Sequence, residues 1–174
     1  MEKAINLALE AGFSHAGVLR ADTIELKEEV RQMCAACGVY GKRWSCPPGC
    51  GELPELRAKI GAYDVGILVQ TVGQLEDEFD GEGMMETEAL HKENFTKVYG
   101  LLRKEYPGML AIGAGCCTIC KDCSYPDAPC RFPDRMVSSM EACGMVVTEV
   151  CRANGMAYNY GRNTIAYTSC FLLK

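Results

Sequence analysis

Apolar and polar positions along the chain follow a helical period in some stretches and a strand-like pattern in others. Apolar residues at helical spacing, bounded by capping residues and by glycine or proline, predict five helices, at residues 2–11, 22–33, 53–62, 84–105 and 134–153. Runs of β-branched and aromatic residues predict four strands, at residues 14–19, 65–72, 109–115 and 164–172. Two remaining stretches, residues 34–51 and 116–133, fit neither pattern and are rich in cysteine.

The order of these elements predicts the fold class. Strands alternate with helices, and no linker, repeat or low-complexity tract interrupts them. We therefore expect an α/β fold in one domain over residues 1–174, with a single mixed sheet flanked by helices. The two cysteine-rich loops should emerge beside the sheet and form a small metal-binding lobe.

Length, charge and hydropathy exclude several classes of protein. A chain of 174 residues that is 48% hydrophobic can bury a core of its own. Its net charge of −5, with no large basic face, argues against nucleic acid or an anionic membrane as partner. No apolar run approaches the roughly 20 residues that cross a bilayer, and the first residues lack the features of a secretory signal. We expect a cytoplasmic protein.

The chain contains 12 cysteines, which is the feature that most constrains its function. In a reducing cytoplasm such abundance indicates metal ligation or thiol chemistry rather than disulfides. A redox-active Cys-x-x-Cys pair would account for two of the cysteines but not for two clusters of them. Metal ligation is the better interpretation.

The first cysteine-rich loop contains a set of four candidate ligands, which we call the first set: Cys34, Cys37, Cys46 and Cys50. Two cysteines separated by two residues can curl around one metal centre, and the second pair can complete the coordination. Pro47 lacks an N–H and turns the chain away from the centre, while Gly49 lets the backbone approach closely. This loop taken alone fits zinc and iron equally well.

The second loop contains the second set, with three cysteines at successive spacings of three and a fourth further on: Cys117, Cys120, Cys123 and Cys130. Bacterial ferredoxins use such a triplet around a [4Fe–4S] cluster, whereas zinc modules usually present two separated pairs. The triplet favours iron–sulfur, and we extend that interpretation to the first set. Cys116 could replace Cys117 as a ligand if the loop adopts a different register.

The other cysteines fit a structural role. Cys143 and Cys151 fall on one face of the predicted helix 134–153, and Cys170 lies on one side of the last strand, so all three are expected in the core. Neither His15 nor His91 has a ligand-like spacing. Five cations beside the ligand cysteines could offset a cluster's negative charge or could be ordinary surface residues: Lys42, Arg43, Lys121, Arg131 and Arg135. Two aromatic side chains are expected to shield the metal of the first loop, those of Tyr40 and Trp44.

Residues 37–50, which read CGVYGKRWSCPPGC, resemble a signature of an uncharacterised family of cysteine-rich predicted metal-binding proteins from anaerobic bacteria and methanogens. Residues 117–133 (CTICKDCSYPDAPCRFP) and 139–144 (SMEACG) look like the second signature of the same family. The resemblance covers nearly the whole chain. It implies metal binding and an anaerobic setting, on the cysteines already chosen, and it implies no reaction.

These observations favour a protein with two [4Fe–4S]-type clusters, one on each set, that transfers electrons to or from a redox partner protein. Two alternatives remain open. The first is an enzyme that uses a cluster together with a cleft beside the sheet, because the α/β body is larger than two clusters require. The second is a zinc-stabilised interaction module.

Overall fold

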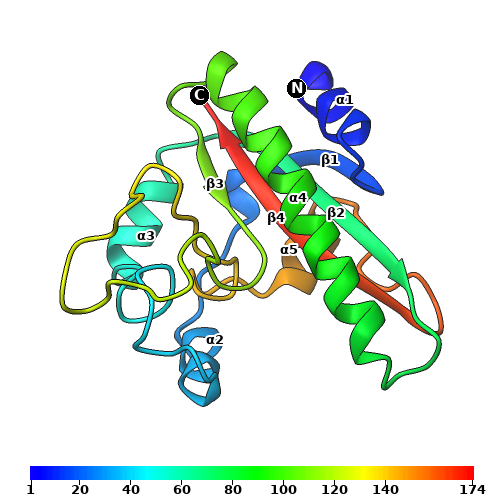
Figure 1. The fold of residues 1–174 in the computed structure, drawn as a ribbon. Coiled ribbons are helices and arrows are strands. Elements are labelled where there is room, and N and C mark those ends of the chain that lie inside the picture. Colours follow the sequence, from blue (N-terminus) through cyan, green and yellow to red (C-terminus); the bar gives the residue numbers. More distant parts are fainter.

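The computed structural model describes residues 1–174 and centres on one four-stranded sheet (Figure 1). The strands are β1 (His15–Arg20), β2 (Val65–Gln74), β3 (Leu110–Ile112) and β4 (Thr164–Leu173). Their order in the sheet is β1-β2-β4-β3, so the strand latest in the chain lies between β2 and β3. The prediction of an α/β fold with a single sheet is confirmed.

The sheet is antiparallel throughout its strands, and the expectation of a mixed sheet is wrong in this respect. That expectation rested on helices alternating with strands, which usually places parallel strands side by side. β2 and β3 do run in the same direction, because both are antiparallel to β4. However, β4 separates them, so the only parallel pairing is an isolated bridge between Gly113 and Ser139.

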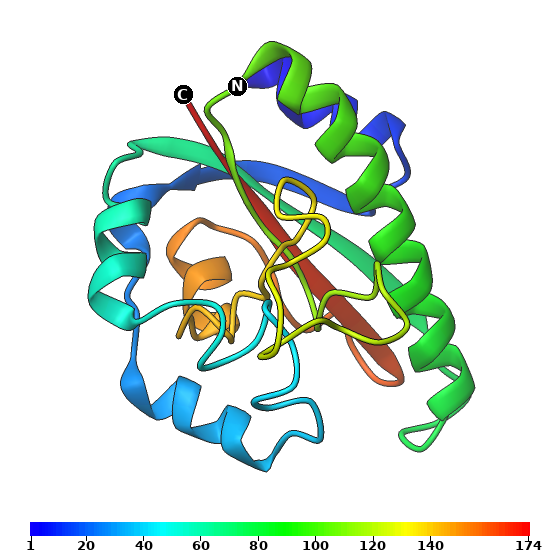
Figure 2. The same ribbon diagram turned by 60° about the vertical axis from the view of Figure 1, so that its left-hand side comes forward.

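Five α-helices surround the sheet: α1 (Glu2–Glu10), α2 (Glu28–Met33), α3 (Leu53–Ile60), α4 (Gly81–Glu105) and α5 (Val147–Ala153). Helices α1 and α4 cover one face (Figure 2). Side chains alternate along a strand. Accordingly Ile67, Val69 and Phe171 point to this face, and they pack with Val98 and Leu102 of α4. No helix is both long and apolar enough to cross a membrane.

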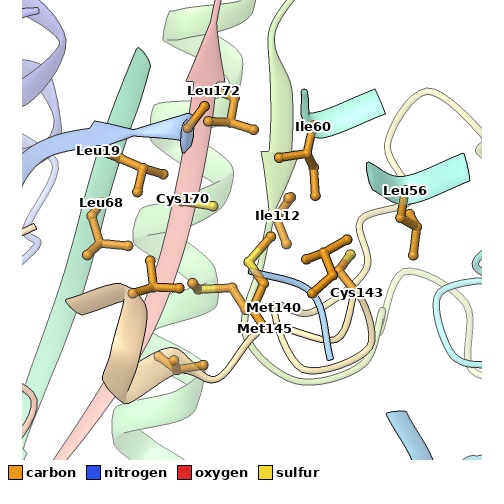
Figure 3. Close-up of a cluster of buried hydrophobic side chains, with 14 of the residues drawn as sticks. Leu19, Leu56, Ile60, Leu68, Ile112, Met140, Cys143, Met145, Cys170 and Leu172 are labelled. Carbon is orange, nitrogen blue, oxygen red and sulfur yellow. The ribbon is translucent and has the colours of Figure 1, made fainter. Parts of the chain in front are cut away.

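The opposite face of the sheet holds the larger core, 16 buried residues contributed by the strands, α3, α5 and the segment before α5. Figure 3 shows the sulfur atoms of Cys143 and Cys170 among aliphatic side chains of this core. Cys151 also belongs to it. The prediction that these three cysteines are core residues is therefore confirmed by their burial.

The predicted helix over residues 134–153 is present only as α5, and residues 134–146 form turns. The backbone in the middle of this segment bonds to the residue after β3: Met140 N donates to Gly113 O (3.0 Å), and Gly113 N donates to Ser138 O (2.8 Å). Gly144 has a positive φ of 89°, which ends any regular helix there. The helical spacing of Met140 and Cys143 reflects burial of a folded loop.

Two other predicted elements are shorter than expected. Residues 22–33 form a 3-10 turn, η1 (Ala21–Thr23), and the short helix α2, because Leu26 between them pairs with Met145 in an isolated bridge. β3 covers three residues of the predicted strand 109–115. As a result the chain leaves the sheet at Gly113 and enters the second cysteine-rich loop early.

The two cysteine-rich loops lie next to each other near β3, which is an edge strand (Figure 2). Cys50 of the first loop and Met136, which follows the second loop, line a cavity of about 100 Å³ together with Ile112 of β3. The loops therefore cover an edge that would otherwise expose unpaired backbone groups. This is the lobe beside the sheet that the sequence predicts.

Candidate metal centre

The first set lies between α2 and α3. Cys34 opens a 3-10 turn, η2 (Cys34–Ala36), and Cys37 N donates to Cys34 O at 2.9 Å. A second turn is closed by Cys50 N, which donates to Cys46 O at 3.1 Å. Each turn brings one pair of thiols to the same side of the chain.

The thiols of the first set are close enough to influence one another electrostatically. Burial raises the pKa of Cys34, and the nearby Cys37 raises it further. Burial likewise raises the pKa values of Cys46 and Cys50. Cys46 is also affected by Cys116, Cys50 and Cys37, and Cys50 by Cys34. Each of the four thiols therefore has two others of the set as neighbours, and Cys116 lies beside Cys46. The structure therefore brings the first set together.

A buried arginine accompanies the first set. Arg31 of α2 is 7% exposed, and no carboxylate lies within ion-pair distance of its guanidinium. Its Nη2 lies 3.8 Å from the sulfur of Cys50, which also approaches the carbonyl of Ala142 at 3.6 Å. A buried cation is costly unless an anion accompanies it. Metal binding to the first set would supply such anions, because it converts the thiols to thiolates.

Sequence reasoning missed Arg31, although the sequence contained a signal for it. The residue stands three positions before Cys34, and residues three apart lie on the same face of a helix. Arg31 at the end of α2 therefore faces the same side as the first ligand candidate.

The second set lines a single small cavity of about 20 Å³, to which all four of its members contribute: Cys117, Cys120, Cys123 and Cys130. Arg43 and Trp44 of the first loop complete its wall. Cys116 is not part of this cavity, whereas Cys117 is, so the structure favours Cys117 as the member of the set. The triplet and the more distant cysteine are thus brought together.

Cys123 is the one thiol whose pKa the structure lowers. Burial acts to raise its pKa, but the backbone N–H groups of Tyr125, Trp44 and Ser124 and the guanidinium of Arg43 together outweigh burial. Metal ions bind the thiolate form of cysteine. The protein therefore holds this sulfur in a state suited to ligation.

The two loops are joined by contacts from three consecutive residues of the first loop. Arg43 Nη1 donates to the carbonyl of Cys117 at 3.1 Å, and Trp44 Nε1 donates to the carbonyl of Ala128 at 3.0 Å. Ser45 Oγ accepts from Cys117 N at 3.1 Å and lies 3.7 Å from the sulfur of Cys46. The buried serine therefore touches a cysteine of each set.

Gly49 is required where the two loops meet. A Cβ at this position would lie 2.9 Å from the carbonyl of Arg43 and 2.9 Å from the ring of Tyr125. The Tyr125 ring in turn packs edge-on against Trp44, with ring centroids 4.9 Å apart. Trp44 thus shields the second set, not the first as the sequence suggested, and Tyr40 is exposed.

The thiols are gathered but are not positioned around a single ion. No three histidine, cysteine, aspartate or glutamate side chains converge closely enough to hold a metal ion as they stand. All 12 cysteines are free thiols, so none is taken up by a disulfide. Eight sulfurs in two groups, with a buried cation beside one and backbone N–H donors beside the other, form a donor set that fits thiolate-ligated metal centres.

The family comparison identifies what kind of protein this is. A family model described as predicted metal-binding protein (DUF2284) matches residues 17–173. The chain belongs to this family. The predicted recognition of a cysteine-rich metal-binding family is therefore confirmed, and both loops lie inside the matched range. Searches of curated proteins and of solved structures gave no match.

Within this predicted metal-binding protein, the remaining cysteines differ chemically from the two sets. Burial raises the pKa of Cys143 to about 12 and raises that of Cys170 as well. Burial also raises the pKa of Cys151. Buried thiols that resist ionisation are poor ligands and poor nucleophiles. These three thiols are buried members of the larger core.

The other residues singled out in the sequence have various roles. Lys42 Nζ donates to Gly38 O (2.8 Å) and Arg131 Nη1 donates to Asp122 O (2.7 Å), so both brace loop backbone. His15 stacks on Tyr160, away from the loops. His91 is a buried residue of α4, and its ring nitrogens lie 3.0 Å from Thr71 Oγ1 of β2 and 2.7 Å from Ser169 Oγ of β4.

Proposed function

We propose that this protein carries two iron–sulfur clusters of the [4Fe–4S] type and transfers electrons in an anaerobic redox system. The first set would hold one cluster and the second set the other. The observation that carries the proposal is the second set: a Cys-x-x-Cys-x-x-Cys triplet and Cys130 line one cavity, and backbone N–H groups together with Arg43 lower the pKa of Cys123. Zinc is the competing metal.

The spacing of the cysteines along the second loop supports a cluster over a single zinc ion. Bacterial ferredoxins use a Cys-x-x-Cys-x-x-Cys triplet together with one more distant cysteine around [4Fe–4S] clusters. Zinc modules usually present two separated pairs of ligands instead.

The charges and hydrogen bonds around the sets suit redox-active clusters. A cluster bound by four thiolates exchanges one electron and is negatively charged in its usual states. Arg31 beside Cys50 and Arg43 beside Cys123 would offset that charge, and N–H groups directed at Cys123 would raise the reduction potential. Ser45, which contacts both sets, gives a short connection between them. Electrons would leave to, or arrive from, a redox partner protein.

Metal analysis after anaerobic purification tests the proposal. We expect a brown protein with about eight iron atoms and a similar amount of sulfide per chain, broad visible absorption that bleaches with dithionite, and an electron paramagnetic resonance signal from reduced clusters. A colourless protein with stoichiometric zinc would contradict the proposal and select the zinc module instead.

Single substitutions then test the assignment of ligands. Cys120→Ser should remove about half of the iron, because one set of two loses a ligand. Cys143→Ser and Cys151→Ser are matched controls from the core and should leave iron content nearly intact. Cys116→Ser should also retain it. If Cys143→Ser loses as much iron as Cys120→Ser, the division into ligands and core cysteines is wrong.

A further inference from the structure

A second, larger cavity lies against the cavity of the second set. It is enclosed by α4 on one side and by residues 113–119 on the other, and its volume is about 360 Å³. Cys117 lines both this cavity and the small cavity of the second set. Cavities that bind small organic molecules start at about 300 Å³. The space is therefore large enough for such a molecule, next to the proposed cluster.

The walls of this cavity are cationic in a chain whose net charge is −5. Lys92 and Arg135 contribute side chains, and no aspartate or glutamate lines the space. Lys92 Nζ is bound by Glu88 Oε1 at 2.5 Å, just outside the lining. Arg135 has no carboxylate within ion-pair distance and stands over the ring of Phe132 at 5.6 Å. One positive charge is therefore left free for a ligand.

Backbone groups in the same wall offer further donors. The N–H groups of three consecutive lining residues, Ala114, Gly115 and Cys116, have no acceptor in the protein. Gly115 has a φ of 66°, in the left-handed region. Successive N–H groups around such a residue form concave sites that attract anions. Two independent features, the free guanidinium and the N–H groups, thus favour a negatively charged ligand.

The rest of the cavity is mainly apolar. Phe95 and Val137 contribute to the wall, with Ile119 from the second loop. Phe95 is held in place by stacking on Phe171 of β4, with ring centroids 4.7 Å apart. An apolar wall with one charged end is typical of a site for an organic acid.

We propose that this cavity binds a small organic carboxylate with an apolar body, its carboxylate held by Arg135 and the N–H groups of residues 114–116, with Lys92 beside them. A carboxylate fits better than a phosphate ester, because the one free guanidinium balances the single negative charge of a carboxylate but not the higher charge of a phosphate monoester. This goes beyond electron transfer, since it gives the protein a small-molecule ligand beside one proposed cluster. Binding itself does not depend on a cluster.

Calorimetric titration of the anaerobically purified protein with benzoate tests the proposal, with benzamide as the neutral control of the same shape. We expect saturable binding of one benzoate per chain and at least about tenfold weaker binding of benzamide. Equal binding of both, or no saturable benzoate binding, would overturn the proposal. Inorganic phosphate that competes with benzoate at equal concentration would overturn the choice of a carboxylate.

Matched variants locate the site. Arg135→Gln and Lys92→Gln should weaken benzoate binding, the former by about tenfold. Lys97→Gln is the control for Lys92→Gln, because Lys97 also sits on α4 and pairs with the residue four positions earlier (Glu93, 2.8 Å) but lies outside the cavity. If Lys92→Gln and Lys97→Gln lose the same amount of benzoate affinity, benzoate does not bind in this cavity.

A third variant separates loss of the site from loss of the fold. Gly100 is an exposed residue of α4 that lines the cavity, and a Cβ there meets no atom within 4 Å. Gly100→Trp removes a helix-weakening glycine and fills the cavity, so its thermal midpoint should not fall while benzoate binding is lost. Benzoate binding that survives this substitution contradicts the proposal. Iron is measured on the same samples. If the protein binds benzoate but contains no iron, only the proposed clusters are contradicted. If the protein contains iron but does not bind benzoate, only the ligand site is contradicted.

Discussion

The two cysteine-rich loops place their thiols in different electrostatic surroundings. In the first loop, burial raises the pKa values of Cys34, Cys46 and Cys50, and the buried guanidinium of Arg31 opposes this effect in part at Cys34 and Cys50. In the second loop, backbone N–H groups and Arg43 lower the pKa of Cys123 although burial acts against them. In the first loop, a single positive charge is set against the effect of burial on the thiolates. In the second loop, several backbone dipoles and Arg43 stabilise the thiolate of Cys123 in a more open place.

This difference has a consequence for the protein without its metal. Thiols in the first loop are protonated until a metal displaces the protons, because their charged forms are disfavoured by burial. Cys123 in the second loop needs less energy to lose its proton. The second set is therefore the better prepared of the two to accept a metal, and the first depends more on one residue.

The largest effect is expected from removing the charge of the first loop. Arg31→Met should cost the first set its cluster, and hence about half of the iron, because losing one partner of a buried charged contact costs about 3–5 kcal/mol. Iron analysis and electron paramagnetic resonance would measure the loss. Arg20→Met, which removes an exposed arginine paired with Asp22 at 3.5 Å, is the control and should retain all iron. If Arg31→Met keeps its full iron content, the first set does not depend on Arg31, and the proposed difference between the loops is wrong.

Acid should destabilise the body that carries both loops. Burial, followed by the charge of Lys92, lowers the pKa of His91 to about 4. The unfolded chain takes up this proton near pH 6.5 and the folded chain only near pH 4, so stability is complete above 6.5 and falls as pH decreases toward 4. The loss should reach about 3 kcal/mol.

Denaturant unfolding from pH 7 to pH 4 measures this effect. In His91→Gln the fall should be smaller by that amount, since glutamine does not titrate. This variant also sharpens the comparison of the loops, because acid release of metal can then be assigned to a loop and not to the body. An unchanged pH dependence would show that His91 is not the titrating group.

A smaller effect is expected from the residue that joins the loops. Arg43→Met removes the donor to the carbonyl of Cys117, so the second set should release its iron to a chelator about tenfold faster while the first set is unaffected. Arg43→Lys should be intermediate, because lysine lacks the planar fork. Lys42→Met is the neighbouring control, since Lys42 bonds only within the first loop. If Arg43→Met and Lys42→Met release iron equally fast, the contact between Arg43 and the second loop does not control iron release.

The smallest effect concerns the reactivity of the metal-free thiols. After removal of metal under reducing conditions, iodoacetamide at neutral pH should modify Cys123 several-fold faster than Cys46, because alkylation requires the thiolate. Cys143 should react more slowly than either, because burial raises its pKa to about 12. Peptide mass spectrometry over time gives the order in which the thiols are alkylated. If Cys46 is modified before Cys123, the proposed difference between the loops is contradicted.

Local patterns predicted the elements whose residues pack as regular structure. The strands 65–72 and 164–172 and the helix 84–105 correspond closely to β2, β4 and α4, because each places an unbroken apolar stripe on the sheet or its neighbours. The prediction of a helix over residues 134–153 was wrong in its first part, where Ser138 and Met140 form backbone hydrogen bonds with Gly113. Such pairing between distant segments leaves no local signal.

The cysteine spacings predicted which thiols lie together, but not what surrounds them. The grouping of Cys117, Cys120, Cys123 and Cys130 follows from the triplet and one further cysteine. The roles of Arg31 and Ser45 depend on how α2 and the two loops meet in space, which spacing along the chain does not encode. The larger cavity depends likewise on the approach of α4 to residues 113–119.

The position of β4 bears on how the protein matures. β4 is the partner of both β2 and β3, yet it follows both cysteine-rich loops in the chain. During translation, β3 has no neighbouring strand when residues 116–133 leave the ribosome, and the second loop has no fixed base. Delivery of metal to a finished site must therefore wait until β4 has been made. A finished metal site would therefore exist only on the folded chain and not on the nascent one.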